Sequence, residues 1–166
     1  MARTVIIGYG NPLRGDDGLG WHAAERLRDD LAGPDVEVIA CQQLTPELAE
    51  IISRAERAVF IDACHGAYPG TISCQPVKIA AAQARSFSHD LDPAALLAGA
   101  QVLYGAAPTE CVVMSISGAS FAHGQALSPV VAAALPLLVD RACAFAIHGF
   151  ASPEQRSNTV PDEAGQ

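Results

Sequence analysis

Two adjacent acidic residues, Asp16 and Asp17, lie in a glycine-rich segment near the N-terminus of the chain. The apolar run at residues 4–7 predicts a strand, and Gly8 and Gly10 predict a tight exit into a loop that carries both acids. In open α/β sheets, ligands and catalytic groups gather at loops that leave the carboxyl ends of strands. Carboxylates placed there can bind a metal ion or transfer protons. Because an acid before a helix can also cap it, we expect one of the two to have that structural role.

A third acid, Asp62, ends the apolar segment 57–63, which is typical of a central strand buried on both faces. An acid at that position must find polar partners or face a cleft at the edge of the sheet. Among the five histidines, His89 lies in a polar connection and His65 follows Asp62 by three residues. Two carboxylates and one imidazole would form an O,O,N site with open positions, which suits nickel, zinc, manganese or iron.

Several other kinds of site are not indicated. The glycines at 8 and 10 lack the third glycine of the dinucleotide-binding fingerprint, and the chain has neither a P-loop nor a G-x-S-x-G motif. Its five cysteines contain no C-x-x-C pair, so we interpret them as reduced core residues of a cytoplasmic protein. The net charge of -8, with ten dispersed Lys and Arg residues, argues against a nucleic-acid partner.

Neither a secretory signal nor a membrane span is expected. The chain enters a strand pattern directly after Ala2 and Arg3, without the charged and apolar regions of a signal peptide. The longest apolar stretch, residues 130–147, contains Pro136, Asp140 and Arg141, which would be costly at the centre of a bilayer. We therefore interpret this stretch as a buried helix and expect no membrane partner.

Strand and helix patterns alternate along the 166 residues, which predicts an α/β three-layer sandwich. Its sheet is expected to be twisted and mostly parallel, with about five strands and with helices on both faces. Strands are expected at 3–9, 35–41, 57–63, 70–78 and 111–116, and helices at 19–31, 46–55, 93–104 and 129–145. Thr45 is the expected N-cap of the second helix, with Pro46 at its first position. We expect a single domain over residues 1–150 and a disordered tail over 151–166.

The segment 7–20, IGYGNPLRGDDGLG, resembles the N-terminal signature of the nickel-iron hydrogenase maturation proteases, G-x-G-N-x-L-x-x-D-(D/E)-x-x-G. Further similarity to that family lies in residues 43–48, 60–63, 88–91, 115–116 and 127–129. The resemblance thus extends over nearly the whole chain up to about residue 148, and it implies the same three-layer fold.

This resemblance implies a cytoplasmic endopeptidase, of the aspartic type, that removes a C-terminal extension from the precursor of a hydrogenase large subunit after nickel insertion. It implies that Asp17 and Asp62 are catalytic, and that Asp17, Asp62 and His89 contact nickel supplied by the substrate. Another divalent ion could occupy the same place in the isolated protein. Asp16 then takes the capping role. Either a carboxylate or a metal ion could activate the water, and the sequence leaves this open.

Two other functions fit the same residues. The first is a nickel-binding maturation chaperone of the same fold that performs no hydrolysis. The second is a hydrolase that acts on a small molecule in the same pocket. A loss of mass from the precursor after incubation with the protein would distinguish the protease from both alternatives.

Overall fold

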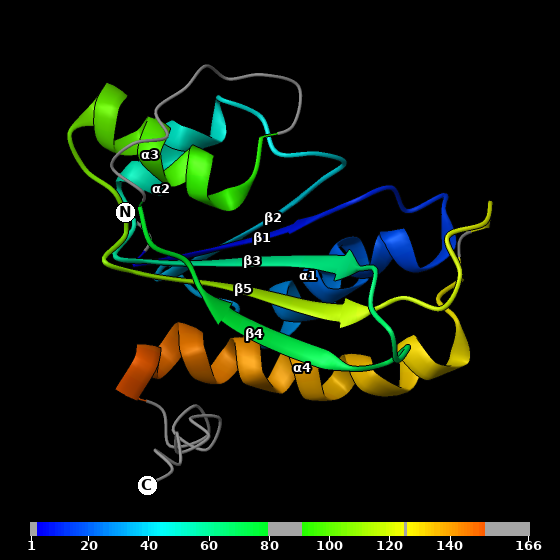
Figure 1. The fold of residues 1–166 in the computed structure, drawn as a ribbon. Coiled ribbons are helices and arrows are strands. Elements are labelled where there is room, and N and C mark those ends of the chain that lie inside the picture. The colour runs from blue at the N-terminus through cyan, green and yellow to red at the C-terminus, as the bar shows by residue number, and fades with distance from the viewer. Residues whose placement is uncertain (1–2, 80–90, 125, 152–166) are drawn as a thin grey trace, which may run out of the picture.

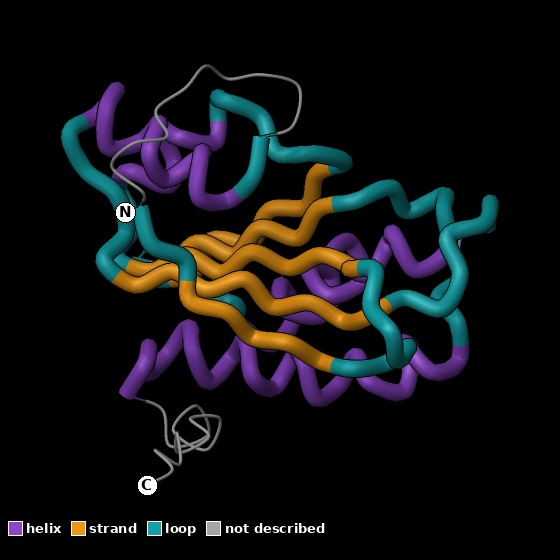
Figure 2. Tube along the Cα trace, viewed as in Figure 1, coloured by secondary structure: helices purple, strands orange, loops and turns teal. Residues whose placement is uncertain are grey.

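A five-stranded sheet forms the centre of the molecule, and helices cover both of its faces (Figures 1 and 2). The computed structural model describes residues 3–79, 91–124 and 126–151. The strands are β1 (Thr4–Tyr9), β2 (Val36–Cys41), β3 (Arg57–Cys64), β4 (Ile72–Pro76) and β5 (Glu110–Ser117). Their order is β2-β1-β3-β5-β4, and β4 alone among them runs antiparallel to its neighbour. The expected α/β fold with a mostly parallel sheet is confirmed.

The helices divide into two layers because alternate residues of each strand point to opposite faces. The four α-helices are α1 (Leu19–Asp30), α2 (Leu48–Ser53), α3 (Pro93–Tyr104) and α4 (Pro129–His148). Ile6 of β1 packs with α1 and α4, whereas its neighbours Val5 and Ile7 pack with α2 and α3. The sheet therefore has a separate apolar core on each face, as a three-layer sandwich requires.

Helix α4 has the length and composition that would allow it to cross a membrane. In this fold it lies along the sheet and buries seven residues, among them Leu138 and Phe145. The apolar stretch at 130–147 thus forms a core helix of the α/β layer, as its sequence indicated. Residues 152–166, which include nearly all of the expected tail, lie outside the described residues.

Helix α2 begins later than expected. The sequence predicted a helix over 46–55 capped by Thr45, but α2 begins at Leu48 and no side chain caps it. The Thr45 carbonyl accepts a hydrogen bond from the N–H of Leu48 at 3.1 Å, and the Pro46 carbonyl accepts one from Ala49 at 3.0 Å. Residues 45–47 therefore form a turn that leads into the helix, and the predicted cap is wrong.

Close contact between β1 and α1 sets the position of the loop that carries the acids. A Cβ atom on Gly8 would lie 1.9 Å from the carbonyl oxygen of Gly20, and one on Gly20 would lie 2.4 Å from the backbone nitrogen of Tyr9. Both positions require glycine because the backbones of the strand and the helix touch there. This contact brings the start of α1, and the 3₁₀ helix η1 (Gly15–Gly18) before it, directly over the end of β1.

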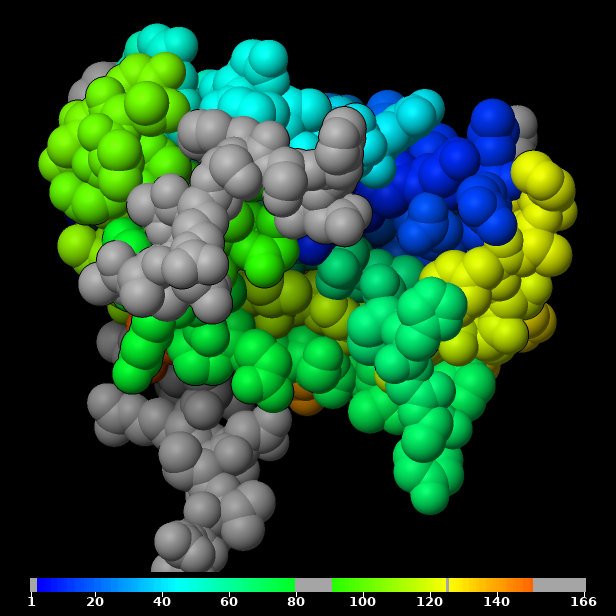
Figure 3. Space-filling view, turned by 45° about the horizontal axis from the view of Figure 1, so that its top comes forward, coloured from blue at the N-terminus to red at the C-terminus, as the bar shows by residue number. Residues whose placement is uncertain are grey.

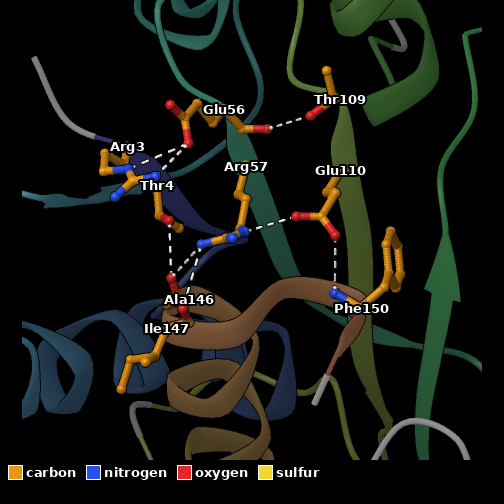
Figure 4. A network of polar contacts seen from close by, with 9 residues as sticks. All are labelled: Arg3, Thr4, Glu56, Arg57, Thr109, Glu110, Ala146, Ile147 and Phe150. Carbon is orange, nitrogen blue, oxygen red and sulfur yellow. Dashed lines mark hydrogen bonds and ion pairs between the residues drawn. The ribbon is translucent and has the colours of Figure 1, made fainter.

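A polar network fixes the far end of α4 to the amino ends of the strands (Figure 4). Arg57 donates to the carboxylate of Glu110 at 2.7 Å, and both side chains are mostly buried. Glu110 also accepts a hydrogen bond from the N–H of Phe150 at 3.0 Å, while Thr4 donates to the carbonyl of Ala146 at 3.1 Å. Burial alone would raise the pKa of Glu110, but the hydrogen bonds from Arg57 and Phe150 hold it below its usual value.

Candidate functional site

The loops that follow β1, β3 and β5 meet at the carboxyl edge of the sheet. Figure 3 shows these segments gathered on one side of the molecule, with the segment after β1 in blue, the segment after β3 in green and residues 118–124 in yellow. The N–H of Gly15 donates to the carbonyl of Gly124 at 2.8 Å, and the N–H of Asp16 donates to the carbonyl of Ser120 at 2.9 Å. The acid-bearing loop and the loop after β5 therefore form one unit.

Asp62 lies near the end of β3, between two hydroxyl groups from the neighbouring strands. The hydroxyl of Ser115, its register partner on β5, donates to Oδ1 at 2.6 Å. The hydroxyl of Tyr9, at the end of β1, donates to Oδ2 at 3.0 Å. All three residues are on the face of the sheet that α2 and α3 cover, because they are in phase with Val5 and Phe60. Each oxygen of the Asp62 carboxylate thus has its own donor.

The electrostatics of Asp62 favour a carboxyl group that accepts a proton more readily than usual. Burial raises the pKa of Asp62, and the negative charge of Asp17 raises it further. The hydrogen bonds from Ser115 and Tyr9 lower it, but the net effect is a raised pKa. Burial and the charge of Asp62 also raise the pKa of Tyr9 far above its ordinary value. Tyr9 therefore remains a protonated donor at neutral pH.

Asp17 is half-buried in η1, and its position depends on the turn that leaves β1. The N–H of Asn11 donates to Oδ2 of Asp17 at 2.8 Å. Gly10 has a φ of 136°, and a Cβ atom there would lie 2.0 Å from the carbonyl oxygen of Asp17. The indole of Trp21 donates to the carbonyl of Gly10 at 2.8 Å and holds the same turn. The negative charge of Asp17 is near enough to contribute to the raised pKa of Asp62.

Asp16 has a different role from the one predicted. It is completely buried, and helix α1 has no side-chain cap at Gly18, so the expected capping role is wrong. Its carboxylate instead accepts hydrogen bonds from the N–H groups of Ala119, Ser120 and Ser128, at 2.7 to 3.0 Å, and from the Ser128 hydroxyl at 2.8 Å. Burial alone would raise the pKa of Asp16, but these four hydrogen bonds lower it. Asp16 therefore joins the acid-bearing loop to the start of α4.

The third predicted metal contact, His89, lies outside the described residues. Its rival His65 is exposed, and its ring stacks on Phe121 with 4.3 Å between ring centroids. Within residues 3–79, 91–124 and 126–151, no three His, Cys, Asp or Glu side chains are grouped so that they could hold a metal ion. Asp17 and Asp62 thus provide two carboxylates, and His65 does not complete a set of three with them.

The start of α3 lies close to this site. Asp92 caps α3 by accepting a hydrogen bond from the N–H of Ala95 at 2.7 Å, and its charge contributes to the raised pKa of Tyr9. Asp92 follows His89 by three residues in the sequence. His89 itself lies outside the described residues and stays a prediction.

Tyr9 and Ser115 are site residues that the sequence did not single out. Both lie in segments that carry the family resemblance, residues 7–20 and 115–116, and phase was a further signal: Tyr9 continues the two-residue period of Val5 and Ile7, and Ser115 follows Val113 in the same way. Their contact with Asp62 depends on β1 and β5 being the two neighbours of β3, and strand order is not encoded in any local pattern.

The protein is thus an α/β sandwich whose candidate site consists of two carboxylates at the carboxyl ends of adjacent parallel strands, where ligands bind in open α/β sheets. No protein-family model matches the sequence, and no curated protein matches it. Among solved structures, a nickel-iron hydrogenase maturation protease, HycI from Thermococcus kodakarensis, is similar with a TM-score of 0.68 and 26% identity. That match covers 85% of this chain and 90% of the other.

Two further structures give the same result. The hydrogenase 2 maturation peptidase of a Thaumarchaeota archaeon has a TM-score of 0.65 and 25% identity, over 84% of this chain and 95% of that one. The hydrogenase maturating endopeptidase HybD from Escherichia coli has a TM-score of 0.71 and 20% identity, over 89% of this chain and 94% of that one. At this identity the match shows only that the folds are alike. The resemblance that the sequence carries is thus supported by solved structures of the same fold that are named as hydrogenase maturation proteases and peptidases.

Proposed function

We propose that this protein is a cytoplasmic endopeptidase that removes the C-terminal extension from the nickel-loaded precursor of a nickel-iron hydrogenase large subunit. The observation that carries the proposal is the pairing of Asp17 and Asp62 on adjacent strand exits, where the charge of one raises the pKa of the other. The similarity to solved structures that are named as maturation proteases and peptidases supports it.

The two acids suit recognition of a metal ion that the substrate brings. Carboxylate oxygens and an imidazole are ligands for divalent nickel, and the proposed set of Asp17, Asp62 and His89 leaves positions for groups of the substrate. A precursor without nickel would lack this contact. An incomplete set of ligands therefore explains how one site can distinguish loaded from unloaded precursor and bring the scissile bond to the carboxyl edge of the sheet.

The two acids have separate hydrogen-bond donors. Asp17 accepts from the N–H of Asn11, while Asp62 accepts from the hydroxyls of Tyr9 and Ser115. We propose that Asp62 accepts the proton from the attacking water, because each of its oxygens has a single donor, Ser115 or Tyr9, and keeps a lone pair free.

Cleavage of the nickel-loaded precursor by single variants tests this proposal. We expect Asp17→Asn, Asp62→Asn and His89→Ala each to abolish the loss of mass from the precursor while unfolding remains cooperative. His148→Ala is the matched control, because His148 is exposed in the last turn of α4, at the amino ends of the strands, and it should process the precursor at the wild-type rate. Wild-type cleavage by both Asp62→Asn and His89→Ala would refute the proposed site.

A nickel-binding chaperone is the alternative outcome of the same experiment. If wild-type protein binds the loaded precursor and the mass of the precursor never changes, the protein recognises nickel without hydrolysis. That result would remove Asp62 as a base and keep it as a ligand.

A further inference from the structure

We infer that Tyr9 and Ser115 are positioning residues, which together hold the carboxylate of Asp62 in the single orientation that the reaction uses. This inference rests on the proposed function of Asp62. Neither hydroxyl is assigned a contact with the substrate; each acts through the carboxylate that it holds.

The geometry supplies one donor for each carboxylate oxygen. Ser115 donates to Oδ1 at 2.6 Å from β5, and Tyr9 donates to Oδ2 at 3.0 Å from β1. These strands flank β3 on its two sides, so Asp62 is held between its neighbours on both sides within the sheet. Because β1, β3 and β5 are hydrogen-bonded along their length, the backbones that carry the two donors are fixed relative to the backbone of Asp62.

The side chain of aspartate has a first torsion with three staggered rotamers and a broad terminal torsion, and two donors on opposite oxygens restrict both of them in Asp62. Each oxygen still has a second lone pair, since a carboxylate can accept about four hydrogen bonds. The carboxylate of Asp62 can therefore keep both donors and still receive a metal ion or a proton. Groups that orient a metal-binding side chain in this way are typically worth about 10 to 100-fold in metal affinity or activity.

The hydroxyl of Tyr9 can be removed without removing its ring. The ring packs against the apolar core under α2 and α3, next to Cys41, so phenylalanine retains that packing. Ser115 is also buried, and its substitution by alanine removes only the hydroxyl group. Tyr104 and Ser53 provide matched controls, because both lie at helix ends away from Asp62, on α3 and α2.

The test compares Tyr9→Phe, Ser115→Ala and the double variant with Tyr104→Phe and Ser53→Ala. In cleavage of the nickel-loaded precursor, we expect kcat to fall about 10-fold in each single site variant, with KM within about twofold of wild type. Because each site variant leaves one carboxylate oxygen of Asp62 without its donor, its thermal midpoint should lie below that of its control. A purely structural role would give the same lower midpoint with kcat unchanged.

A second measurement requires no substrate. Three-bond couplings to the methylene protons of Asp62 should report one side-chain rotamer in the wild type and in both controls, and an average over rotamers in the double variant. A single, unchanged rotamer in the double variant would overturn the inference. If wild-type protein cleaves nothing and the rotamer still becomes averaged, the proposed function fails while the positioning of Asp62 by Tyr9 and Ser115 stands.

Discussion

Replacing Asp16 by asparagine should destabilise the fold by about 2.5 to 6 kcal/mol, although the two side chains have the same shape. Three of the four donors to Asp16 are backbone N–H groups, which cannot turn to become acceptors. The most favourable asparagine would place its amide nitrogen at the Oδ1 position, opposite the N–H of Ser128.

The magnitude follows from these contacts. A buried N–H group left without an acceptor, here that of Ser128, costs about 1 to 3 kcal/mol. The three hydrogen bonds to the other oxygen would persist, but with a neutral acceptor, and each would lose roughly 0.5 to 1 kcal/mol. Because Asp16 is completely buried, solvent does not screen this loss.

Asp62→Asn is the matched control for this prediction. The partners of Asp62 are two hydroxyls, which can rotate and accept hydrogen bonds from an amide. Its raised pKa also means that the ionised form costs stability at neutral pH, so removal of the charge should leave the fold as stable as the wild type or more stable.

Urea unfolding at pH 7, followed by the fluorescence of the single tryptophan, Trp21, measures both variants. The midpoint of Asp16→Asn should fall well below that of the wild type, while that of Asp62→Asn should stay level or rise. Free energies of unfolding for the two variants within about 1 kcal/mol of each other would refute the assignment of Asp16 as a structural residue.

The remaining predictions concern stability. The pKa values of Asp16 and Glu110 are lowered in the fold, so their stabilisation is complete above about pH 5 and is lost as the pH falls through those native values. Urea midpoints between pH 7 and pH 3 should therefore fall more gently in Glu110→Gln than in the wild type, and equal slopes would contradict this. At pH 7 Glu110→Gln should cost about 1 to 2 kcal/mol and leave cleavage unchanged, because Glu110 lies at the amino ends of the strands. Gly8→Ala should lower the thermal midpoint by the equivalent of roughly 1 to 3 kcal/mol or more, because its Cβ atom would clash with the backbone of Gly20. Gly33→Ala is the control: a Cβ atom there has no neighbour within 4 Å, so the midpoint should stay near that of the wild type.

Much of the fold could be predicted because its signals are local. The alternation of strand and helix patterns, the apolar segment that ends in Asp62, and the glycines after β1 are each contained in a few neighbouring residues. The turn at residues 45–47 was missed because a threonine followed by a proline is typical of a helix N-terminus. In the structure, backbone hydrogen bonds close a turn there before the helix begins.

The role of Asp16 could not be predicted because its partners are distant in the chain. Its carboxylate binds residues 103 to 112 positions later, so only the fold shows that it is buried among backbone donors and is not capping α1. Tyr9 and Ser115 were missed for a related reason: each lies 53 positions from Asp62, and their contact depends on strand order.

The mass of the hydrogenase large-subunit precursor, measured after incubation with this protein, tests the central claim most directly. One sample of precursor is loaded with nickel and a second is nickel-free, and both are incubated with wild-type protein and with Asp62→Asn. We predict that only the loaded precursor loses the mass of its C-terminal extension, and only with the wild type. An unchanged mass in every sample, or equal loss from loaded and nickel-free precursor, would contradict the proposal of a protease that recognises nickel in its substrate.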